Sequence, residues 1–302
     1  MERALKIFLT LFVLCFQVLL SGGKTGFNFL SIGVDARVVS LADAGVALPP
    51  EIGTIYYNPS GLALHKKTSL LLTYRNWLVD GRFIYTSFSF PSRFSNFAIS
   101  LTSFSIPDIE IRTRPSEAQG KFTFRDLSIA FSASPNWKSG IKTGITVKYI
   151  FEKIFVDETH LVAFDFGILY AFAISRFNFY TGASLKDIGF KGKYRNSSVN
   201  LPSAISIGAS ASYSVAQSGI EILLLVEAKR KFYESVNLIS TGFGFKFLSS
   251  FVLNLGYISG RKLENLRFGG GIELNKIRLY YSFSSLEYNF PNSHTITINF
   301  NF

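Results

Sequence analysis

Apolar side chains recur at every second position along most of the chain, and this period constrains the fold more than any other feature. Residues 294–302 place Ile296, Ile298 and Phe300 on one face, with threonine or asparagine at the positions between them. Residues 141–149 alternate in the same way. Successive side chains point to opposite faces in a β-strand, whereas an α-helix repeats every 3.6 residues. The sequence therefore predicts an all-β fold.

Similar alternating segments fill residues 68–302 and give about fourteen predicted strands. They are residues 68–76, 83–90, 95–104, 121–132, 140–151, 160–172, 176–185, 203–214, 219–229, 236–247, 251–258, 265–273, 276–285 and 293–302. Most are close to the length of about 9–11 residues that a tilted strand needs to cross a bilayer. The strand lengths are thus compatible with a membrane-spanning sheet.

The predicted connections alternate between short and long. Residues 91–94 and 248–250 form short connections, whereas residues 106–120, 152–159 and 186–202 form long ones. Short turns at one end and long loops at the other are typical of bacterial outer-membrane barrels. A soluble sandwich shares the strand period but gives no reason for this segregation. We therefore expect a transmembrane antiparallel β-barrel of about 14 strands, with both chain ends on the periplasmic side.

The composition agrees with a membrane barrel. The chain is 48% hydrophobic and only 17% charged, whereas ordinary globular domains carry about 25% charged residues. A spanning helix needs about 20 consecutive apolar residues, and polar residues interrupt every run after residue 20 well before that length. Apolar residues spread over strands explain both observations.

The first residues predict export. Arg3 and Lys6 precede an apolar stretch from Ile7 to Leu20, which is followed by small residues. This order is typical of a secretory signal peptide, and we assign it to residues 1–23. The single cysteine, Cys15, lies within it, so the mature chain has no disulfide. We expect the protein in the outer membrane of a diderm bacterium.

The lumen of such a barrel needs an explanation. Eight strands enclose a space that side chains can fill, whereas fourteen leave a lumen. Residues 24–67 are the long stretch without strand alternation. We therefore predict that residues 24–67 form an N-terminal hatch in the lumen and that residues 68–302 form the transmembrane β-barrel.

The predicted hatch carries a distinctive set of motifs. Residues 29–37 read Phe-Leu-Ser-Ile-Gly-Val-Asp-Ala-Arg, residues 41–48 are rich in Ala and Gly, and residues 55–63 read Ile-Tyr-Tyr-Asn-Pro-Ser-Gly-Leu-Ala. They resemble the N-terminal signature of PorV/PorQ-type outer-membrane proteins, relatives of the FadL fatty-acid channels, although Ser60 replaces the usual Ala. The resemblance implies a FadL-like fourteen-stranded barrel with a hatch. Its motif residues here are Gly33, Ala36, Arg37, Asn58, Pro59, Ser60 and Gly61.

The last of these motifs also predicts a local structure. Pro59 restricts the backbone, Asn58 can bond neighbouring backbone groups, and Gly61 tolerates conformations that bulkier residues avoid. We expect a fixed corner inside the barrel. We expect inward polar groups, such as Arg267, Glu273 and Arg278, to hold this corner.

A set of charged residues falls on the inward face when each strand is phased by its apolar residues. The set is Arg75, Lys142, Lys148, Asp165, Glu227, Lys246, Arg267, Glu273 and Arg278. A Lys or Arg that faces lipid at the middle of the membrane costs roughly 2–4 kcal/mol, which favours the inward phase. We interpret the set as a polar lattice that bonds the hatch to the wall. The alternative is a site for the carboxylate of an amphipathic ligand.

Motifs for catalysis and cofactors are missing. His65, His160 and His294 lie far apart, without metal-ligand spacing, and the sequence contains neither a Gly-x-Ser-x-Gly elbow nor a phosphate loop. We expect no enzymatic activity, no cofactor and no metal site. Strand residues that converge only in the fold are the alternative.

The net charge of +11 raises the question of a nucleic-acid partner. Much of the basic excess falls in the predicted outer loops, for example at Lys191, Lys193 and Arg230. There the side chains would meet outer-membrane lipid or lipopolysaccharide phosphates, and a solvated loop surface is the alternative. We expect no nucleic-acid partner. The final aromatic, Phe302, resembles the signal read by the barrel assembly machinery.

Two functions remain open from the sequence. One is a passive FadL-like conduit for small hydrophobic or amphipathic molecules, with such a ligand in the lumen. The other is a PorV-like surface shuttle or anchor that partners exported proteins of a type IX-like secretion system. The modest predicted loops favour the conduit.

Overall fold

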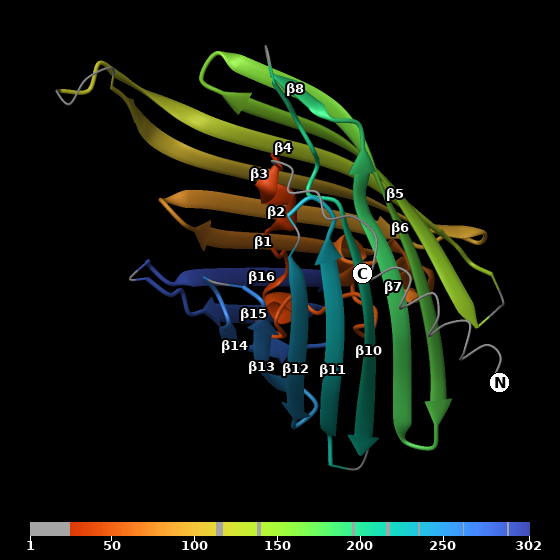
Figure 1. The fold of residues 1–302 in the computed structure, drawn as a ribbon. Coiled ribbons are helices and arrows are strands. Elements are labelled where there is room, and N and C mark those ends of the chain that lie inside the picture. Colours follow the sequence, from red (N-terminus) through yellow and green to blue (C-terminus); the bar gives the residue numbers. More distant parts are fainter. Residues whose placement is uncertain are drawn as a thin grey trace.

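A closed antiparallel barrel makes up most of the structure, a computed structural model (Figure 1). The structure describes residues 25–112, 117–137, 140–194, 197–215, 218–234, 236–261, 263–288 and 290–302. The predicted signal peptide, residues 1–23, lies outside these residues. Within them, fourteen strands form the barrel. The fold class predicted from the alternation is confirmed.

The barrel strands follow one another around the wall in chain order. They are β1 (Ser69–Trp77), β2 (Gly81–Phe90), β3 (Ser95–Ile111), β4 (Gly120–Pro135), β5 (Ile141–Ile154), β6 (Asp157–Ile174), β7 (Phe177–Gly189), β10 (Ala204–Val215), β11 (Ile220–Lys231), β12 (Asn237–Phe247), β13 (Phe251–Ser259), β14 (Leu266–Glu273), β15 (Ile277–Ser284) and β16 (Ser293–Asn301). β1 pairs with β16 and so closes the barrel. β8 (Gly192–Tyr194) and β9 (Ser197–Val199) form a separate hairpin in the connection between β7 and β10.

The two ends of the barrel carry different connections, as predicted. At one end, which we call the short-turn rim, lie turns such as residues 91–94 and 248–250. At the other, the long-loop rim, the longer connections join β7 to β10, β13 to β14 and β15 to β16. The barrel begins and ends at the short-turn rim, because Ser69 pairs there with Asn301.

Two of the predicted long loops are partly strand, which corrects the sequence interpretation. β3 continues to Ile111, and only residues 155–156 separate β5 from β6. Opposite charges face each other across both extensions. The pairs are Glu110 with Lys121 and Lys153 with Glu158. Such cross-strand pairs favour pairing beyond the apolar stripe, where an apolar pattern gives no strand signal.

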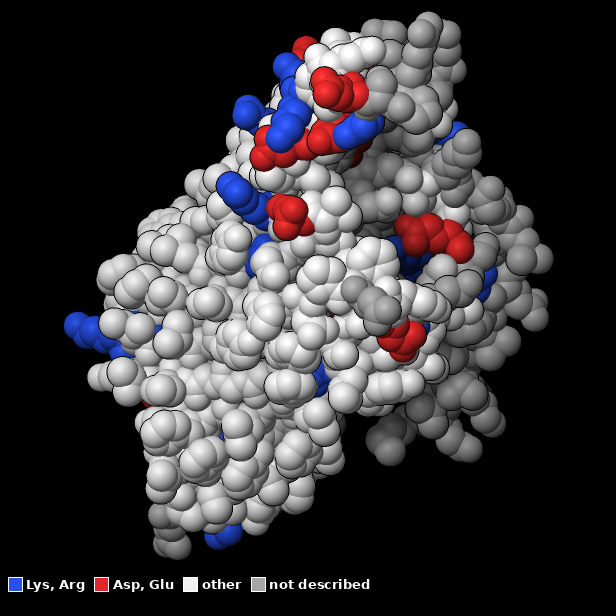
Figure 2. Space-filling model, turned by 90° about the vertical axis from the view of Figure 1, so that its left-hand side faces the viewer, with Lys and Arg blue, Asp and Glu red and all other residues white. Residues whose placement is uncertain are grey.

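The outer face of the wall is apolar. In β13, Leu253, Leu255 and Tyr257 are 50–55% exposed, whereas the alternate residues Asn254 and Ile258 are buried. On the face shown in Figure 2, acidic and basic side chains lie beside one another in the upper part, above a broad area with few charges. An apolar outer face of this kind suits a lipid environment. No helix in the described ranges has the length and apolar character to cross a membrane.

Residues 25–67, which we call the N-terminal segment, lie on the inner side of the wall. The segment contains the short helices η1 (Asn28–Ser31), α2 (Ala36–Ser40), η2 (Ile52–Tyr56) and η3 (Pro59–Leu64). α2 contacts β13–β16, η2 contacts β1 and β2, and η3 contacts β3–β6. In Figure 1 these helices, in red and orange, lie between the near strands β10–β12 and the far strands β1 and β2.

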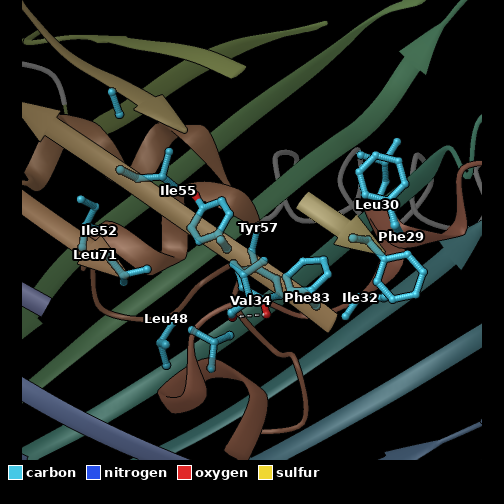
Figure 3. Close-up of a cluster of buried hydrophobic side chains, with 14 of the residues drawn as sticks. Phe29, Leu30, Ile32, Val34, Leu48, Ile52, Ile55, Tyr57, Leu71 and Phe83 are labelled. Atoms are coloured by element: carbon cyan, nitrogen blue, oxygen red, sulfur yellow. Dashed lines mark hydrogen bonds between the residues drawn. The ribbon is translucent and has the colours of Figure 1, made fainter. Parts of the chain in front are cut away.

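The hydrophobic core sits inside the barrel. Phe29, Val34 and Ile52 of the N-terminal segment are at most 2% exposed and pack in one cluster with Leu71 and Phe83 of the wall (Figure 3). The segment thus supplies the apolar surface that the inward wall residues bury. Burial of apolar area contributes about 25 cal/mol per Å2, so the core holds the segment against the wall.

Candidate functional site in the lumen

The corner around Asn58 joins the N-terminal segment to β6. The Asn58 Oδ1 atom accepts hydrogen bonds from the Ser60 backbone N–H (3.1 Å) and hydroxyl (2.6 Å). Its Nδ2 group donates to the carbonyls of Val46 (2.7 Å) and Ile168 (3.1 Å). Pro59 is the first residue of η3, a position where its missing N–H has no helical partner to lose. One amide therefore fixes both the corner and its distance from the wall.

Glycines in the wall let the corner approach the barrel backbone. A Cβ atom on Gly144 would overlap the backbone of Pro59, and one on Gly167 would overlap the side chain of Asn58. The same holds for other wall glycines that face the segment. They are Gly182, Gly208, Gly256 and Gly269. Close backbone approach is a main reason for glycine inside a strand.

Two sequence expectations about the corner are wrong. Gly61 lies within η3 and has no positive φ, so the glycine does not serve a left-handed turn. An added Cβ would lie 3.3 Å from the Thr54 hydroxyl oxygen. The corner is also held by β5 and β6 rather than by Arg267, Glu273 and Arg278. Strand phasing places a side chain on the inner face but does not identify the part of the segment opposite to it.

The first motif packs against the other side of the barrel. The carbonyl of Gly33 accepts a hydrogen bond from Arg75 (3.3 Å), and the backbone N–H of Ala36 donates to Thr297 Oγ1 (2.8 Å). Ala36 begins α2, where the Asp35 side chain accepts from the backbone N–H of Arg37. The motif thus builds a helix start directly on β1 and β16.

A buried network ties the segment to the long-loop rim. We call it the arginine cluster, and its members are Arg75, Arg261, Arg267, Asp43 and Glu264. Arg267 lies 2.7 Å from Asp43 and 2.8 Å from Glu264, and Arg75 lies 2.7 Å from Glu264. Arg261 adds contacts to Asp43 (3.4 Å) and Glu264 (2.9 Å). Both Arg75 and Arg267 are fully buried, so each guanidinium depends on these carboxylates for its charge balance.

A second buried network lies within the wall. Lys148 Nζ is 2.7 Å from Asp165 and 2.6 Å from Asp187, and the Asp187 backbone N–H donates to Asp165 (2.8 Å). Asp187 lies within a register shift between β6 and β7 and has a φ of 57°. One ammonium therefore contacts two carboxylates from neighbouring strands.

The remaining predicted lattice residues make more local contacts. Arg278 and Arg37 both pair with Glu51 of the segment, at 2.7 and 3.0 Å. Glu227 accepts a hydrogen bond from the Val46 backbone N–H (3.0 Å). The other pairs stay within the wall. They are Lys246 with Glu273 (2.5 Å) and Lys142 with the Trp137 carbonyl (2.7 Å). Of the nine, Arg75, Arg267, Arg278 and Glu227 bond directly to the segment.

Sequence reasoning missed several charged residues of the lumen. Asp43 and Glu51 lie in the segment and Glu264 lies in a loop. Because none of them is in a strand, the alternation of apolar residues cannot assign them to the inner or the outer face. Lys186 and Asp187 are adjacent, and both are buried because the register shift interrupts the alternation. Two consecutive charges at the end of an apolar strand were the available signal for such a shift.

Three neighbouring cavities lie between the segment and the wall, from the long-loop rim toward the middle of the barrel. The outer cavity, about 430 Å3, is lined mainly by apolar and aromatic residues, together with two cations and the acidic residue Glu234. Its lining includes Phe29, Ile32, Trp77, Phe104, Leu238, Lys231 and Arg261. A middle cavity of about 30 Å3 shares Ser31, Lys231 and Arg261 with it. An inner cavity of about 20 Å3 shares Leu30 and Tyr56 with the middle one. The inner two hold only about one or two water-sized molecules each.

Burial shifts the pKa values of two titratable groups of the segment in opposite directions. Desolvation, with help from Glu51, raises the pKa of Asp35 to about 7. Desolvation also lowers the pKa of His65 to about 4, because the neutral ring is favoured away from water. His65 lies at the end of the segment, 2.9 Å from the Ser69 hydroxyl. Both groups are therefore uncharged at the lower end of the neutral range.

The C-terminal residue lies at the seam of the barrel. The Phe302 backbone N–H donates to the Thr68 carbonyl (2.9 Å), and its side chain is 74% exposed. Its backbone thus extends the pairing of β16 with β1 by one bond, while its ring faces away from the lumen contents. The predicted role in assembly remains a prediction.

Comparisons with known proteins identify the fold alone. No family model and no curated protein matches the sequence, so the PorV/PorQ resemblance stays a prediction. The toluene transporter TbuX of Ralstonia pickettii is similar in structure, with a TM-score of 0.57 at 10% identity over 92% of this chain and 100% of that one. The CymD monoaromatic hydrocarbon channel gives 0.54 at 10% identity over 92% and 99% of the two chains. A deltaS2 mutant of the TodX monoaromatic hydrocarbon channel gives 0.54 at 9% identity over 88% and 97%. The chain therefore shares the fold of these three proteins.

Proposed function

We propose that the protein is a passive outer-membrane conduit for small hydrophobic molecules, with the N-terminal segment as its hatch. One observation carries the proposal. The outer cavity presents Phe29, Trp77, Phe104 and Leu238 at the long-loop rim and ends on the segment. An apolar pocket with a few polar groups is the usual form of a small-molecule site. An apolar solute entering from the rim would meet a binding pocket first and the hatch second.

The comparisons support the same class of solute. TbuX is described as a toluene transporter, and CymD and TodX as monoaromatic hydrocarbon channels. We extend this class to the present chain because its outer cavity is lined by aromatic and aliphatic side chains. The expected location is the outer membrane of a diderm bacterium, with lipopolysaccharide around the long-loop rim. The protein needs no cofactor and no catalysis for this role. The PorV-like function stays a prediction from the sequence resemblance.

The hatch role is tested by deletion of residues 27–60. The deletion should leave a barrel with a wider lumen, because the buried core of the segment is removed. Conductance in planar bilayers and sensitivity to bulky hydrophobic antibiotics should both rise. Assembly is checked by the heat-dependent shift in gel mobility. An assembled barrel with wild-type conductance and drug sensitivity would show that the segment does not block the lumen.

The conduit role is tested by filling the outer cavity. Leu238 lines the cavity and is 5% exposed, so Leu238→Trp should reduce entry of a hydrophobic dye such as N-phenyl-1-naphthylamine into cells with an intact lipopolysaccharide layer. Leu255→Trp is the matched control, because Leu255 faces outward and is 50% exposed. Expression of the wild type should raise dye entry several-fold over cells without it. Equal dye entry with and without the protein would contradict the proposal.

A further inference from the structure

Two of the three histidines of the chain lie on the outer face of the barrel, and each is bonded to a tyrosine. His160 of β6 and His294 of β16 are exposed, whereas His65 belongs to the N-terminal segment. A hydrogen bond of 2.6 Å joins the Tyr149 hydroxyl to His160 Nδ1. A second, also of 2.6 Å, joins the Tyr281 hydroxyl to His294 Nδ1. We call these two arrangements the tyrosine–histidine pairs.

The two pairs share one local geometry, although they lie on different hairpins of the wall. In β5 and β6, Phe151 is directly opposite His160, and their ring centres are 4.9 Å apart. In β15 and β16, Phe283 is directly opposite His294, and their ring centres are 5.5 Å apart. In both hairpins the tyrosine precedes the phenylalanine by two residues on the same strand. Repetition of one polar arrangement at two separate places indicates a common role.

Both histidines mark the long-loop end of the apolar outer face. Toward the short-turn rim, the next outward residue after His160 is Val162, which is 38% exposed, and the next after His294 is Ile296, which is 47% exposed. Toward the long-loop rim, the next outward residue from His160 is the charged Glu158, and β16 begins just before His294. Polar lipid headgroups lie at the edge of the apolar band of a barrel. The pairs therefore lie at the headgroup level of the leaflet on the long-loop side.

The opposite end of the outer face carries a different kind of contact. There, cross-strand ring pairs join phenylalanines, for example Phe172 with Phe179 (5.1 Å) and Phe247 with Phe251 (5.4 Å). A phenylalanine ring has no hydrogen-bond donor for a headgroup. The tyrosine–histidine pairs thus offer polar contacts to one leaflet that these phenylalanine pairs do not offer to the other.

An exposed arginine lies two strands from His160 on the same outer face. Arg125 of β4 is directly opposite Lys153 of β5, which is itself opposite Glu158 of β6. Lys153 and Glu158 offset each other in charge, so Arg125 leaves this part of the face positive. Neighbouring strands are about 4.8 Å apart, which places the Arg125 backbone roughly 10 Å from that of His160. Two long side chains can therefore contact one group held between them.

The second pair also has an arginine two strands away. The His294 backbone N–H donates to the Asn76 side chain of β1 (2.5 Å), and Asn76 is directly opposite Arg82 of β2. Arg82 is exposed, and its cross-strand neighbours are the uncharged Asn76 and Ser105. Each tyrosine–histidine pair thus has one arginine beside it at the long-loop end of the outer face.

The second nitrogen of each imidazole is the donor that remains. Across the described parts of the chain, Nε2 of His160 and Nε2 of His294 have no hydrogen-bond partner. When the tyrosine hydroxyl donates to Nδ1, the ring proton lies on Nε2. An imidazole N–H and a guanidinium are both donors, and hydrogen bonds from such donors to phosphate oxygens are among the strong, charge-assisted ones.

We propose that each tyrosine–histidine pair binds a phosphate group of a lipopolysaccharide molecule in the outer leaflet. The Nε2–H group of the histidine donates to the phosphate, and Arg125 at the first site or Arg82 at the second supplies the opposite charge. The acyl chains of the lipid lie against the apolar outer face below. The proposal rests on the outer-membrane location but not on the hydrophobic conduit, because both sites lie on the outside of the wall.

The first experiment measures lipid binding to the wild type and needs no variant. Purified barrel in detergent is titrated with lipid A, the phosphate-bearing anchor of lipopolysaccharide, and native mass spectrometry counts the bound copies. Two copies should bind before any further ones. Dephosphorylated lipid A should bind about tenfold more weakly or less, because the charge-assisted hydrogen bonds are lost. Equal binding of the two lipids would overturn the proposal. Inorganic phosphate at the same concentration should not displace lipid A, and displacement would overturn the assignment to a lipid.

Histidine variants assign the two copies to the two sites. His160→Phe and His294→Phe each keep an outward aromatic ring and remove the imidazole donor. Each single variant should therefore lose one tightly bound copy of lipid A, and the double variant should lose both. The heat-dependent shift in gel mobility identifies the assembled protein in each case. Two tightly bound copies on the assembled double variant would overturn the assignment.

Further variants in the His294→Phe background, where only the first site remains, test its other members. Tyr149→Phe releases Nδ1 and Arg125→Met removes the charge, so both should weaken the binding of lipid A. Tyr257→Phe is the control for the first change, because Tyr257 also faces outward and is 50% exposed. Arg176→Met is the control for the second, because Arg176 is exposed at the short-turn rim. Unchanged binding in both Tyr149→Phe and Arg125→Met would overturn the proposed geometry. None of these measurements involves transport, so a negative result for dye entry would leave them unaffected.

Discussion

Gly144 of β5 and Pro59 of the N-terminal segment are in direct backbone contact, because a Cβ atom on Gly144 would overlap the Pro59 carbonyl group. Gly144 is paired across the strands with Gly167, which faces Asn58 in the same manner. Two adjacent strands therefore present bare backbone to one corner of the segment. The corner can be displaced by a single methyl group on either strand.

The first prediction concerns this contact. Gly144→Ala should loosen the docking of η3, since overpacking of a tight site costs about 1–3 kcal/mol. Hydrogen exchange in residues 52–65 should become faster, and the thermal unfolding midpoint should fall. Gly120→Ala is the control, because its added Cβ would meet nothing closer than Ile111 at 3.6 Å. Equal exchange in both variants would contradict the proposed tight contact.

A second prediction concerns the arginine cluster. Asp43→Asn removes a carboxylate from the fully buried Arg267, and breaking a buried pair costs about 3–5 kcal/mol. We expect faster hydrogen exchange across residues 29–48 and a higher conductance in planar bilayers, because the segment is less firmly held. Asp108→Asn breaks the exposed contact to Lys121 (3.7 Å), where a pair contributes less than about 1 kcal/mol. That control should behave as wild type.

A third prediction concerns pH. Asp35, with a pKa of about 7 in the folded protein and an ordinary value of 3.8, binds more protons when folded between those values, so its contribution to stability falls as pH rises from about 4 to 7. His65, with a pKa of about 4 when folded and an ordinary value of 6.5, binds fewer protons when folded, so its contribution falls as pH drops from 6.5 to 4. The two contributions to the free energy of unfolding therefore change with pH in opposite directions, each by at most about 1.4 kcal/mol per pH unit.

Single variants separate the pH-dependent contributions of Asp35 and His65 to stability. Relative to wild type, Asp35→Asn should lose stability as pH falls from 6.5 to 4, because only the pH-dependent contribution of His65 remains. His65→Gln should instead lose stability as pH rises through the same window. Denaturant unfolding midpoints at several pH values measure both effects. If the two variants kept the same pH profile as wild type, neither group would be buried in the ionisation state inferred here.

The fourth prediction concerns the chain end. Deletion of Phe302 removes the backbone bond to Thr68 at the seam and the terminal aromatic that resembles an assembly signal. The amount of heat-modifiable barrel in the outer membrane should fall, while export across the inner membrane stays at the wild-type level. Phe302→Tyr keeps both the bond and an aromatic ring and should assemble normally. Wild-type levels of the deletion variant would leave Phe302 as one more outward aromatic.

The sequence could predict the wall because lipid imposes a simple rule on it. A strand such as β13 must alternate, with Leu253 and Leu255 facing outward and Asn254 facing inward, and this rule holds without knowledge of any partner. The closed barrel and its fourteen strands follow from that rule. The strand extensions at the long-loop rim were missed because charged pairs, rather than alternating apolar residues, hold them together.

The contents of the lumen were much harder to predict. The alternation of apolar residues places Arg267 on the inner face, but its partner Asp43 lies in a segment whose sequence has no such alternation. The register shift at Lys186 and Asp187 buries both residues, which strict alternation does not predict. Side chains inside a barrel are matched to a segment that is distant in sequence, so their pairing depends on the folded path of that segment.

That path has a consequence for the order of events in assembly. The N-terminal segment starts at the long-loop rim, where Gly26 bonds to Asn200 (3.0 Å), and ends at the opposite rim, where Thr68 bonds to Phe302 (2.9 Å). It therefore runs through the whole lumen, while the strands that surround it close at the seam of β1 and β16. A completed ring would have to admit the segment lengthwise through a space already lined by its buried partners. We therefore expect the wall to curl around a segment that is already in place, with closure of the seam as the last step.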